Sequence, residues 1–203
     1  MEDDKVKEFL NKHILGNSEL AEATRLGYRG MFLEILETYM ADVEEESRTI
    51  AVYIADAMSQ MSTVPRSGDE LSVYKNPQTF KAIVTVFTDF QHVAEYAMDH
   101  YDGIESGRFK GNGAKEELKA LLEYHKHTEI QIQQQFMSTG SIILPNGLLA
   151  AMKDFLCWGL EIILGRDNMF KFIEEFNKAQ KILNSHYLMI NMALKSKTGK
   201  LKN

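Results

Sequence analysis

Apolar residues recur at three- and four-residue steps along most of this 203-residue chain, and this spacing is typical of amphipathic helices. The clearest pattern begins at Asn76 and Pro77, which suit an N-cap and a first helical position. Its apolar positions are Phe80, Ile83, Val84, Phe87, Phe90, Ala94, Met98 and Tyr101. No stretch alternates convincingly with a period of two beside hairpin turn residues. The pattern predicts an all-α fold without a sheet.

The same spacing predicts six to seven helices, separated by glycine, proline and polar stretches. A long helix is expected from about Ser18, as its N-cap, to the acidic residues 42–46. Asp167 or Asn168 is expected to cap the last helix, which reaches about Lys195. The remaining helices are predicted at 49–61, 114–137 and 148–164. The 148–164 helix is apolar on most sides, so either its own domain or a partner must cover it.

Length and composition indicate one all-helical domain, 1–203, with an N-terminal extension helix at 1–17 and a basic tail at 196–203. We expect that tail to be either a frayed, solvated terminus or a stub that leads towards another element. No apolar run approaches the ~18 residues of a membrane span, and the charged first residues do not resemble a secretory signal. We therefore expect a cytoplasmic protein without a membrane segment. A net charge of -6 argues against a nucleic-acid partner.

Motifs of enzymatic or metal chemistry are missing from the sequence. Its only cysteine, Cys157, excludes an intrachain disulfide and the common structural zinc sets. There is no HExxH pair, no Glu-x-x-His pair of a di-iron bundle, no phosphate-binding glycine loop and no GxSxG elbow. We expect a protein that is not an enzyme.

Two histidines stand two positions apart in the predicted helix 114–137, and they must point in nearly opposite directions. His125 shares a face with the apolar residues of the helix, whereas His127 points away from them. Those apolar residues are Leu118, Leu121, Leu122, Ile132 and Phe136. An inward histidine is commonly a core residue bonded to a carbonyl or to a neighbour such as Glu129. Alternatively, its neutral imidazole could bind a haem iron.

Three segments resemble the globin domain of globin-coupled sensors and the related single-domain sensor globins. The segment around the proximal histidine of this family resembles LLEYHKHTEIQIQQQF in the present chain. The helix and loop before it resemble KNPQTFKAIVTVFTDFQHVAEYAMDHYDG, and the closing helix resembles NKAQKILNSHYLMINMAL. The resemblance covers roughly residues 18–195 in layout. It implies a globin-like bundle with an extra N-terminal helix, a haem cofactor, and two C-terminal helices that pair in a homodimer.

The family's isoleucine-glycine pair after the histidine is missing here, and Thr128 stands where His125 would need the isoleucine. With His127 as the ligand, Ile130 would fit that position, but the ring would leave the apolar face. The periodicity favours His125 as the metal ligand. The resemblance places a distal tyrosine at Tyr53, for which an interfacial core role is the alternative. The expected pocket is completed by Phe87, Phe90, Val93, Leu121 and Phe136.

Two hypotheses from different classes follow. The first is a haem-binding sensor globin that binds a diatomic gas and signals through its C-terminal helix pair. The second is a cofactor-free all-helical regulatory or protein-interaction domain, acting as a dimer or in a hetero-complex through the helix 148–164 and the final helix.

Overall fold

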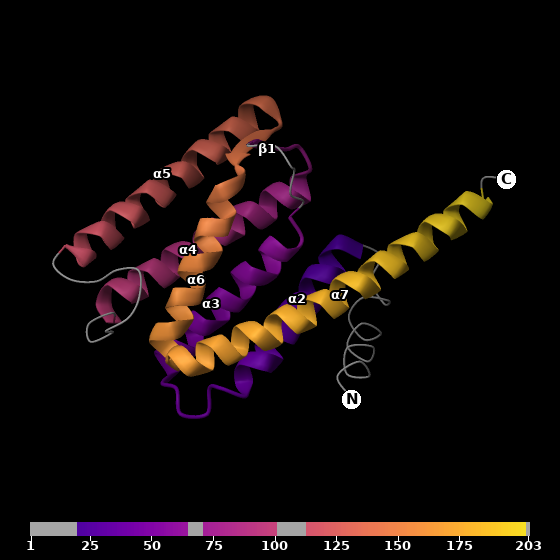
Figure 1. The fold of residues 1–203 in the computed structure, drawn as a ribbon. Coiled ribbons are helices and arrows are strands. Elements are labelled where there is room, and N and C mark those ends of the chain that lie inside the picture. The colour runs from indigo at the N-terminus through magenta and orange to yellow at the C-terminus, as the bar shows by residue number, and fades with distance from the viewer. Residues whose placement is uncertain (1–19, 65–70, 101–112, 202–203) are drawn as a thin grey trace.

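The computed structural model describes residues 20–64, 71–100 and 113–201. These residues form six helices and a sheet of two short strands (Figure 1). The elements are α2 Leu20–Glu37, α3 Glu45–Ser62, β1 Leu71–Tyr74, α4 Pro77–His100, α5 Ala114–Thr139, β2 Ile142–Pro145, α6 Asn146–Leu164 and α7 Arg166–Leu201. The predicted extension helix at 1–17 and the cap at Ser18 lie outside the described residues. The mostly helical character predicted from the sequence is confirmed.

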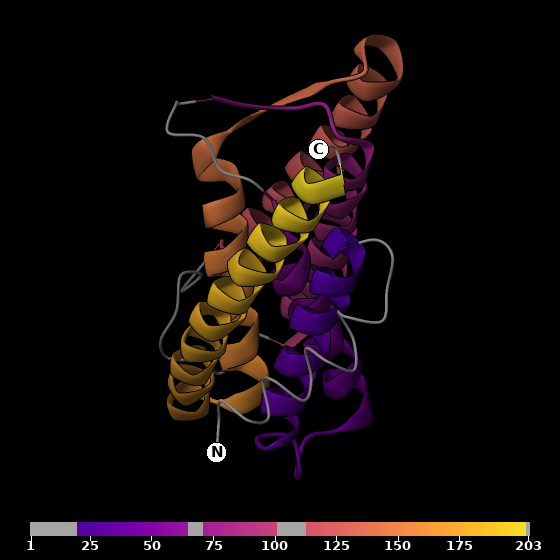
Figure 2. The same cartoon turned by 90° about the vertical axis from the view of Figure 1, so that its right-hand side faces the viewer.

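The helices form two layers. In the first layer α2, α3, α4 and α5 pack side by side in chain order. In the second, α6 packs across α3 and α4, while α7 packs on α6 and α2. Figure 2 shows α7 running diagonally over the bundle with α2 beside it. No helix in the described ranges is long and apolar enough to cross a membrane.

The start of α4 follows the sequence prediction. The Asn76 side-chain oxygen accepts hydrogen bonds from the backbone N–H of Gln78 at 2.8 Å and of Thr79 at 3.4 Å. Pro77 occupies the first helical position, where its missing N–H costs nothing because that group would be unpaired anyway. The cap fixes the residue at which α4 begins, and the apolar positions of the helix determine the face that meets the core.

The prediction of a fold without a sheet is wrong. β1 and β2 pair antiparallel, with Leu71 opposite Pro145 and Tyr74 opposite Ile142. Burial alternates along both strands, as expected for a sheet with one covered face. Each strand has only four residues, and no hairpin turn links them, so neither showed a strand signal in the sequence.

The acidic stretch 42–46 does not extend α2, and only its last two residues belong to α3. α2 ends at Glu37, and Glu45 and Glu46 lie in the first turn of α3, where negative charge is favoured by the helix dipole. The Arg48 guanidinium secures the corner by donating to the carbonyl oxygens of Met40 at 2.6 Å and Val43 at 2.9 Å. A corner held by side-chain hydrogen bonds to backbone carbonyls is invisible to a pattern of apolar residues alone.

The last helix also differs from its prediction at both ends. α7 begins at Arg166, directly after Gly165 with φ of 82°, so neither Asp167 nor Asn168 is its cap. A left-handed glycine separates it from α6 and allows the sharp turn. The backbone stays helical to Leu201, so the helix extends past its predicted end at about Lys195.

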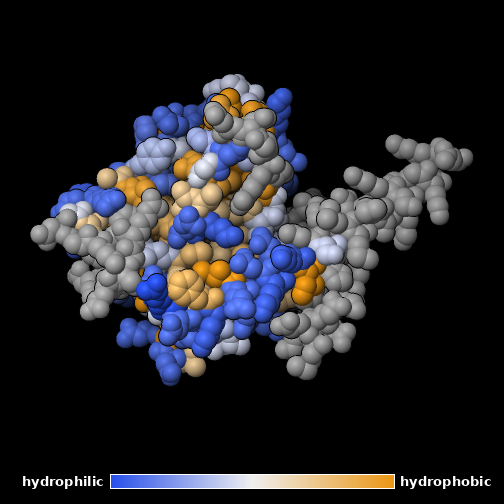
Figure 3. All heavy atoms as spheres, in the orientation of Figure 1, coloured by the Kyte–Doolittle hydropathy of each residue, from blue (hydrophilic) through white to orange (hydrophobic). Residues whose placement is uncertain are grey.

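The apolar helix α6 is covered by its own domain. Its buried face is packed by α3, α4 and α7, and consists of Leu149, Met152, Phe155, Leu156, Trp158, Gly159, Leu160 and Leu164. Figure 3 shows apolar residues on this side of the molecule only in patches separated by polar ones. Of the two ways of covering this helix that the sequence left open, the intramolecular one is found.

Gly159 allows α6 to pack closely against α3 and α4. A Cβ at this position would lie 2.8 Å from Val93 Cγ1 on α4 and 3.3 Å from Ile54 Cδ1 on α3. The first distance is below any ordinary carbon–carbon contact, so the glycine is required by packing and not by its backbone angles.

We predict that Gly159→Ala destabilises the fold by about 1–3 kcal/mol, because overpacking must push α6 away from α4. Gly147→Ala, at the start of the same helix, is the matched control, since a Cβ there meets nothing within 4 Å. It should be neutral or stabilising by up to about 1 kcal/mol. Urea unfolding monitored by circular dichroism measures both. Equal effects would contradict the proposed close packing.

Candidate functional site

α5 turns one of its two neighbouring histidines into the core. The buried positions of this helix include Leu118, Leu122, His125 and Ile132, which recur at the helical period. His125 is 4% exposed, whereas His127 is exposed. The orientation predicted from the spacing is therefore confirmed for both residues.

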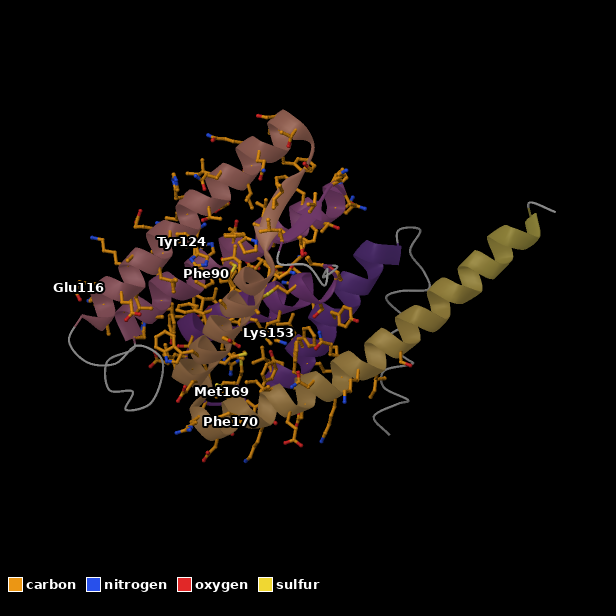
Figure 4. The ribbon with its side chains drawn as sticks, turned by 45° about the horizontal axis from the view of Figure 1, so that its top comes forward. Phe90, Glu116, Tyr124, Lys153, Met169 and Phe170 are labelled. Carbon is orange, nitrogen blue, oxygen red and sulfur yellow. The ribbon has the colours of Figure 1, made fainter. Side chains whose placement is uncertain are left out.

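His125 is held by contacts of the kind that a core histidine makes. Its Nδ1 lies 2.8 Å from the carbonyl oxygen of Leu121, one turn earlier. Its ring stacks on Phe90 of α4 with centroids 4.2 Å apart, and the edge of Tyr124 approaches at 5.3 Å. Figure 4 shows Phe90 within the bundle and Tyr124 on α5. A carbonyl partner for a core histidine is one of the two bonds that the sequence suggested.

The environment keeps His125 neutral. Burial lowers the pKa of the imidazole below its ordinary value of 6.5, and the hydrogen bond to the Leu121 carbonyl offsets only part of this shift. A carbonyl oxygen can only accept, so Nδ1 carries the proton and Nε2 is the basic nitrogen. This is the tautomer that a metal-binding histidine with a carbonyl partner adopts.

The other residues of the predicted pocket do not converge on His125. Phe136 stacks on Phe80, with centroids 4.0 Å apart, at the far end of the α4–α5 seam. Tyr53 of α3 stacks on the ring of His92 at 4.4 Å. Leu121 is half-buried and supplies its carbonyl oxygen. Of the predicted pocket residues, Phe87 and Phe90 are the ones whose rings contact the histidine ring.

As packed, these residues do not fit a haem. A cavity for a ligand of this size has several hundred Å³, and side chains that line it would be accessible to water. Phe87, Phe90 and Val93 are at most 1% exposed. α4 and α5 are in direct contact along the seam where the predicted pocket lies. Haem binding at His125 therefore requires these two helices to separate.

Within the described ranges, no group of three or more histidine, cysteine or acidic side chains is placed to hold a metal ion. The lone thiol, Cys157, is half-buried on α6. Burial raises its pKa to about 11, so the thiolate that would bind a metal or attack a substrate is scarce at neutral pH.

A second polar cluster lies in the core where α2, α3 and α4 meet, and the sequence analysis missed it. Asp89 of α4 is 4% exposed and hydrogen-bonds to the side chain of Asp56 on α3. Asp56 in turn lies 3.2 Å from Nε of Arg29 on α2. The Asp89–Asp56–Arg29 cluster thus joins three helices in one line of charged groups.

The cluster is incompletely hydrogen-bonded. Asp89 Oδ2 and Arg29 Nε are buried atoms without a hydrogen-bond partner among the described residues. The contact between Nε and the Asp56 carboxylate is therefore an ion pair without an aligned hydrogen bond. Arg29 also reaches solvent, since its side chain is 41% exposed against 20% for Asp56. Unpaired polar atoms at such depth are rare in folded proteins.

The two carboxyl groups carry one proton between them. Burial, the hydrogen bond to Asp56 and the negative charge of Asp56 raise the pKa of Asp89 to about 9, and Arg29 opposes this shift. Asp89 is therefore protonated at neutral pH and donates to the Asp56 carboxylate. Like-charged carboxyls in contact commonly share a proton in this way.

A sequence signal for this cluster existed. Asp89 follows Val86 by three positions and precedes Val93 by four, so the helical spacing places it on the apolar face of α4. An acid on such a face must find a partner or lose its charge. The partner, Asp56, could not be identified from the sequence because it comes from another helix.

No protein family model, no curated protein and no solved structure matches this chain.

We predict that acidification destabilises the protein through His125. Its pKa is lowered in the folded state, so the unfolded chain binds more protons just below pH 6.5, and stability falls as the pH drops through that value. Urea midpoints between pH 7.5 and 5 should fall less steeply in His125→Gln than in the wild type. His127→Gln, the exposed control, should keep the wild-type slope. Identical slopes in all three proteins would contradict a neutral buried His125.

Proposed function

We propose that this chain is a cofactor-free, all-helical interaction domain that pairs with a second copy of itself through the far half of α7. The course of α7 carries the proposal. The near half of α7, residues 166–182, packs on the other helices through the buried side chains of Phe172, Phe176 and Ala179. The far half comprises residues 183–201. Ile182 is the last described side chain that packs on the core. The backbone then stays helical for about five more turns, to Leu201, and Figure 1 shows this half extending past the other described helices.

A projecting helix of this length requires a partner. Isolated helices are marginal in water, because most helical stability in proteins comes from packing of an apolar face. The sequence spaces apolar residues along this half at three- and four-residue steps, as in a helix that buries one side: Leu183, Tyr187, Ile190 and Leu194. A second copy offers the same stripe, and a two-fold axis allows each stripe to cover the other.

Charge favours an antiparallel arrangement of the two α7 helices. The far end of the helix carries Lys195, Lys197 and Lys200, and the sequence contains no acidic residue after Glu175. In a parallel pair these lysines would face one another and repel. In an antiparallel pair they lie apart from each other, beside the near half of the partner's helix, where the exposed charges include Glu174, Glu175, Lys178 and Lys181. Exposed charges contribute little to the binding free energy, so they influence the relative orientation of the two α7 helices more than the affinity of the dimer.

The near half of α7 is held in place by contacts with α2, with Tyr39 and with α3. Phe176 packs on Phe32 of α2 with ring centroids 4.0 Å apart, and the Tyr39 hydroxyl donates to Glu175 at 2.8 Å. Gln180 reaches α3 and donates to the Ser62 hydroxyl at 3.1 Å. The sequence hypothesis also used α6 as interaction surface, but α6 is covered within the domain, so the proposal rests on α7.

The haem sensor remains a second candidate, supported by one observation. Nδ1 of His125 donates to the Leu121 carbonyl, and a histidine that binds iron through Nε2 commonly makes such a bond. In this case a globin-like domain would open between α4 and α5, take up haem at His125 and bind a diatomic gas.

The pairing proposal predicts a dimer in solution. Light scattering after size-exclusion chromatography should give about twice the chain mass of 23.2 kDa. Ile190→Glu places a charge in the apolar stripe and should return the mass to that of one chain. Ser185→Glu is the control on an exposed position of the same helix and should leave the dimer intact. A wild-type mass of one chain at all concentrations up to the millimolar range would overturn the proposal.

The haem proposal predicts a Soret band that shifts on reduction and again with carbon monoxide, when the protein is purified with haem supplied. His125→Ala should abolish haem retention, and His127→Ala should preserve it. The reverse result would make His127 the ligand. A spectrum without a Soret band would remove the haem candidate and leave the dimer proposal untouched.

A further inference from the structure

The ribbon of β1 and β2 presents a wholly apolar face to solvent. Exposed and buried positions alternate along both strands, and the exposed side chains are Leu71, Val73, Ile143 and Pro145. The register pairs Leu71 with Pro145 and Val73 with Ile143, so these four side chains form one surface, the ribbon face. Figure 2 shows the ribbon crossing the upper end of the molecule between α6 and α5. The solvent side of an antiparallel sheet is normally polar, so this face is unusual.

The sequence around the ribbon face is free of charge. Charged residues make up 26% of the chain, yet residues 130–152 contain no Asp, Glu, Lys or Arg, and neither does β1. This segment supplies the last turns of α5, all of β2 and the first turns of α6. Its exposed helical positions include Gln131, Gln133 and Gln134, where Lys or Glu would suit a helix equally well. Protein interfaces are depleted of charge at their centre in the same way.

The two edges of the ribbon differ in whether they can accept another strand. The edge of β2 is closed, because the Ile143 N–H donates to Gln135 Oε1 of α5 at 3.4 Å and Pro145 has no N–H. This bond shows that Ile143 and Val73 are a non-hydrogen-bonded pair, so the N–H and C=O of Val73 point away from β2. Neither group is hydrogen-bonded within the described residues. The edge of β1 is therefore open for backbone pairing at Val73.

We propose that the ribbon binds an extended, uncharged peptide segment of a partner protein, which adds to the edge of β1 as a third strand. The segment pairs with the N–H and C=O of Val73, and every second side chain of the segment packs beside Leu71 and Val73 on the ribbon face. This surface is distinct from the far half of α7, so the inference goes beyond the pairing of two copies.

Area and charge both favour an extended segment over a folded partner. Leu71, Val73 and Ile143 are 53%, 55% and 45% exposed. Side chains exposed to this extent present on the order of 300 Å² in total, whereas each partner in a standard interface between folded proteins buries ~800 Å². An added strand gains further affinity from backbone hydrogen bonds. A charged segment would lose hydration here without meeting an opposite charge, so the segment is uncharged.

Titration of the isotope-labelled protein with the peptide Thr-Val-Thr-Val-Thr-Val-Thr, blocked at both ends, tests the proposal by amide chemical shifts. The amides of residues 71–75 should shift saturably, with a dissociation constant of about 1 mM or lower, and the Val73 N–H should gain protection from hydrogen exchange. Val73→Lys places a charge on the ribbon face and should weaken binding by about tenfold. Phe170→Lys is the matched control, since Phe170 on α7 is 54% exposed, and it should bind as the wild type does.

A second peptide keeps the test decisive if Val73→Lys disturbs the ribbon. Methylation of the N–H groups along one edge of the peptide preserves its side chains but prevents strand pairing, and wild-type protein should bind it about tenfold more weakly. Equal binding of the two peptides would overturn the proposal, as would the absence of a saturable shift up to about 5 mM peptide. Shifts of residues 71–75 that arise only on raising the protein concentration would assign the surface to a second copy. Shifts caused only by phosphatidylcholine vesicles would assign it to a lipid surface, and either result would also refute a peptide partner.

Discussion

The burial of α4 on three sides is the constraint that organises the rest of the structure. α3, α5 and α6 all pack on this helix, and Ile83, Phe87 and Val93 are fully buried. Every polar group on its inner faces must therefore be paired or uncharged. Asp89 meets this demand by keeping its proton, and His125, which stacks on α4 from the neighbouring helix, meets it by remaining neutral. Both unusual protonation states come from the same desolvation, which also explains why they act in opposite directions of pH.

The elements that the sequence predicted correctly are those whose signals are local. The cap formed by Asn76 and Pro77 needs only three neighbouring residues, and the helical spacing of α4, α5 and α6 extends over several turns. The boundary between α2 and α3 was misplaced because the apolar spacing continues to Tyr39, past the end of α2 at Glu37. β1 and β2 were missed because a strand of four residues has too few alternations to be recognised, and its partner lies in another part of the chain.

The candidate site likewise has features that the sequence predicted and features that depend on the tertiary structure. The face of α5 on which His125 lies follows from the angular spacing of residues around a single helix, and the sequence predicted it correctly. Whether Tyr53 of α3 reaches His125 of α5 depends on how these two helices lie relative to each other, and no periodicity contains that information. Asp89 lies between these cases. Its inward position was readable, but Asp56 and Arg29 belong to helices whose alignment only the tertiary structure defines.

The β1–β2 ribbon has a consequence for the order of folding. Its strands flank the α4–α5 pair and bring together segments that are far apart in the chain. Closing such a long loop is entropically costly before other contacts reward it. The antiparallel pair α4 and α5 can form from nearer neighbours, and its assembly brings the two strands into range. The ribbon is therefore expected to form after the two helices that it encloses have packed.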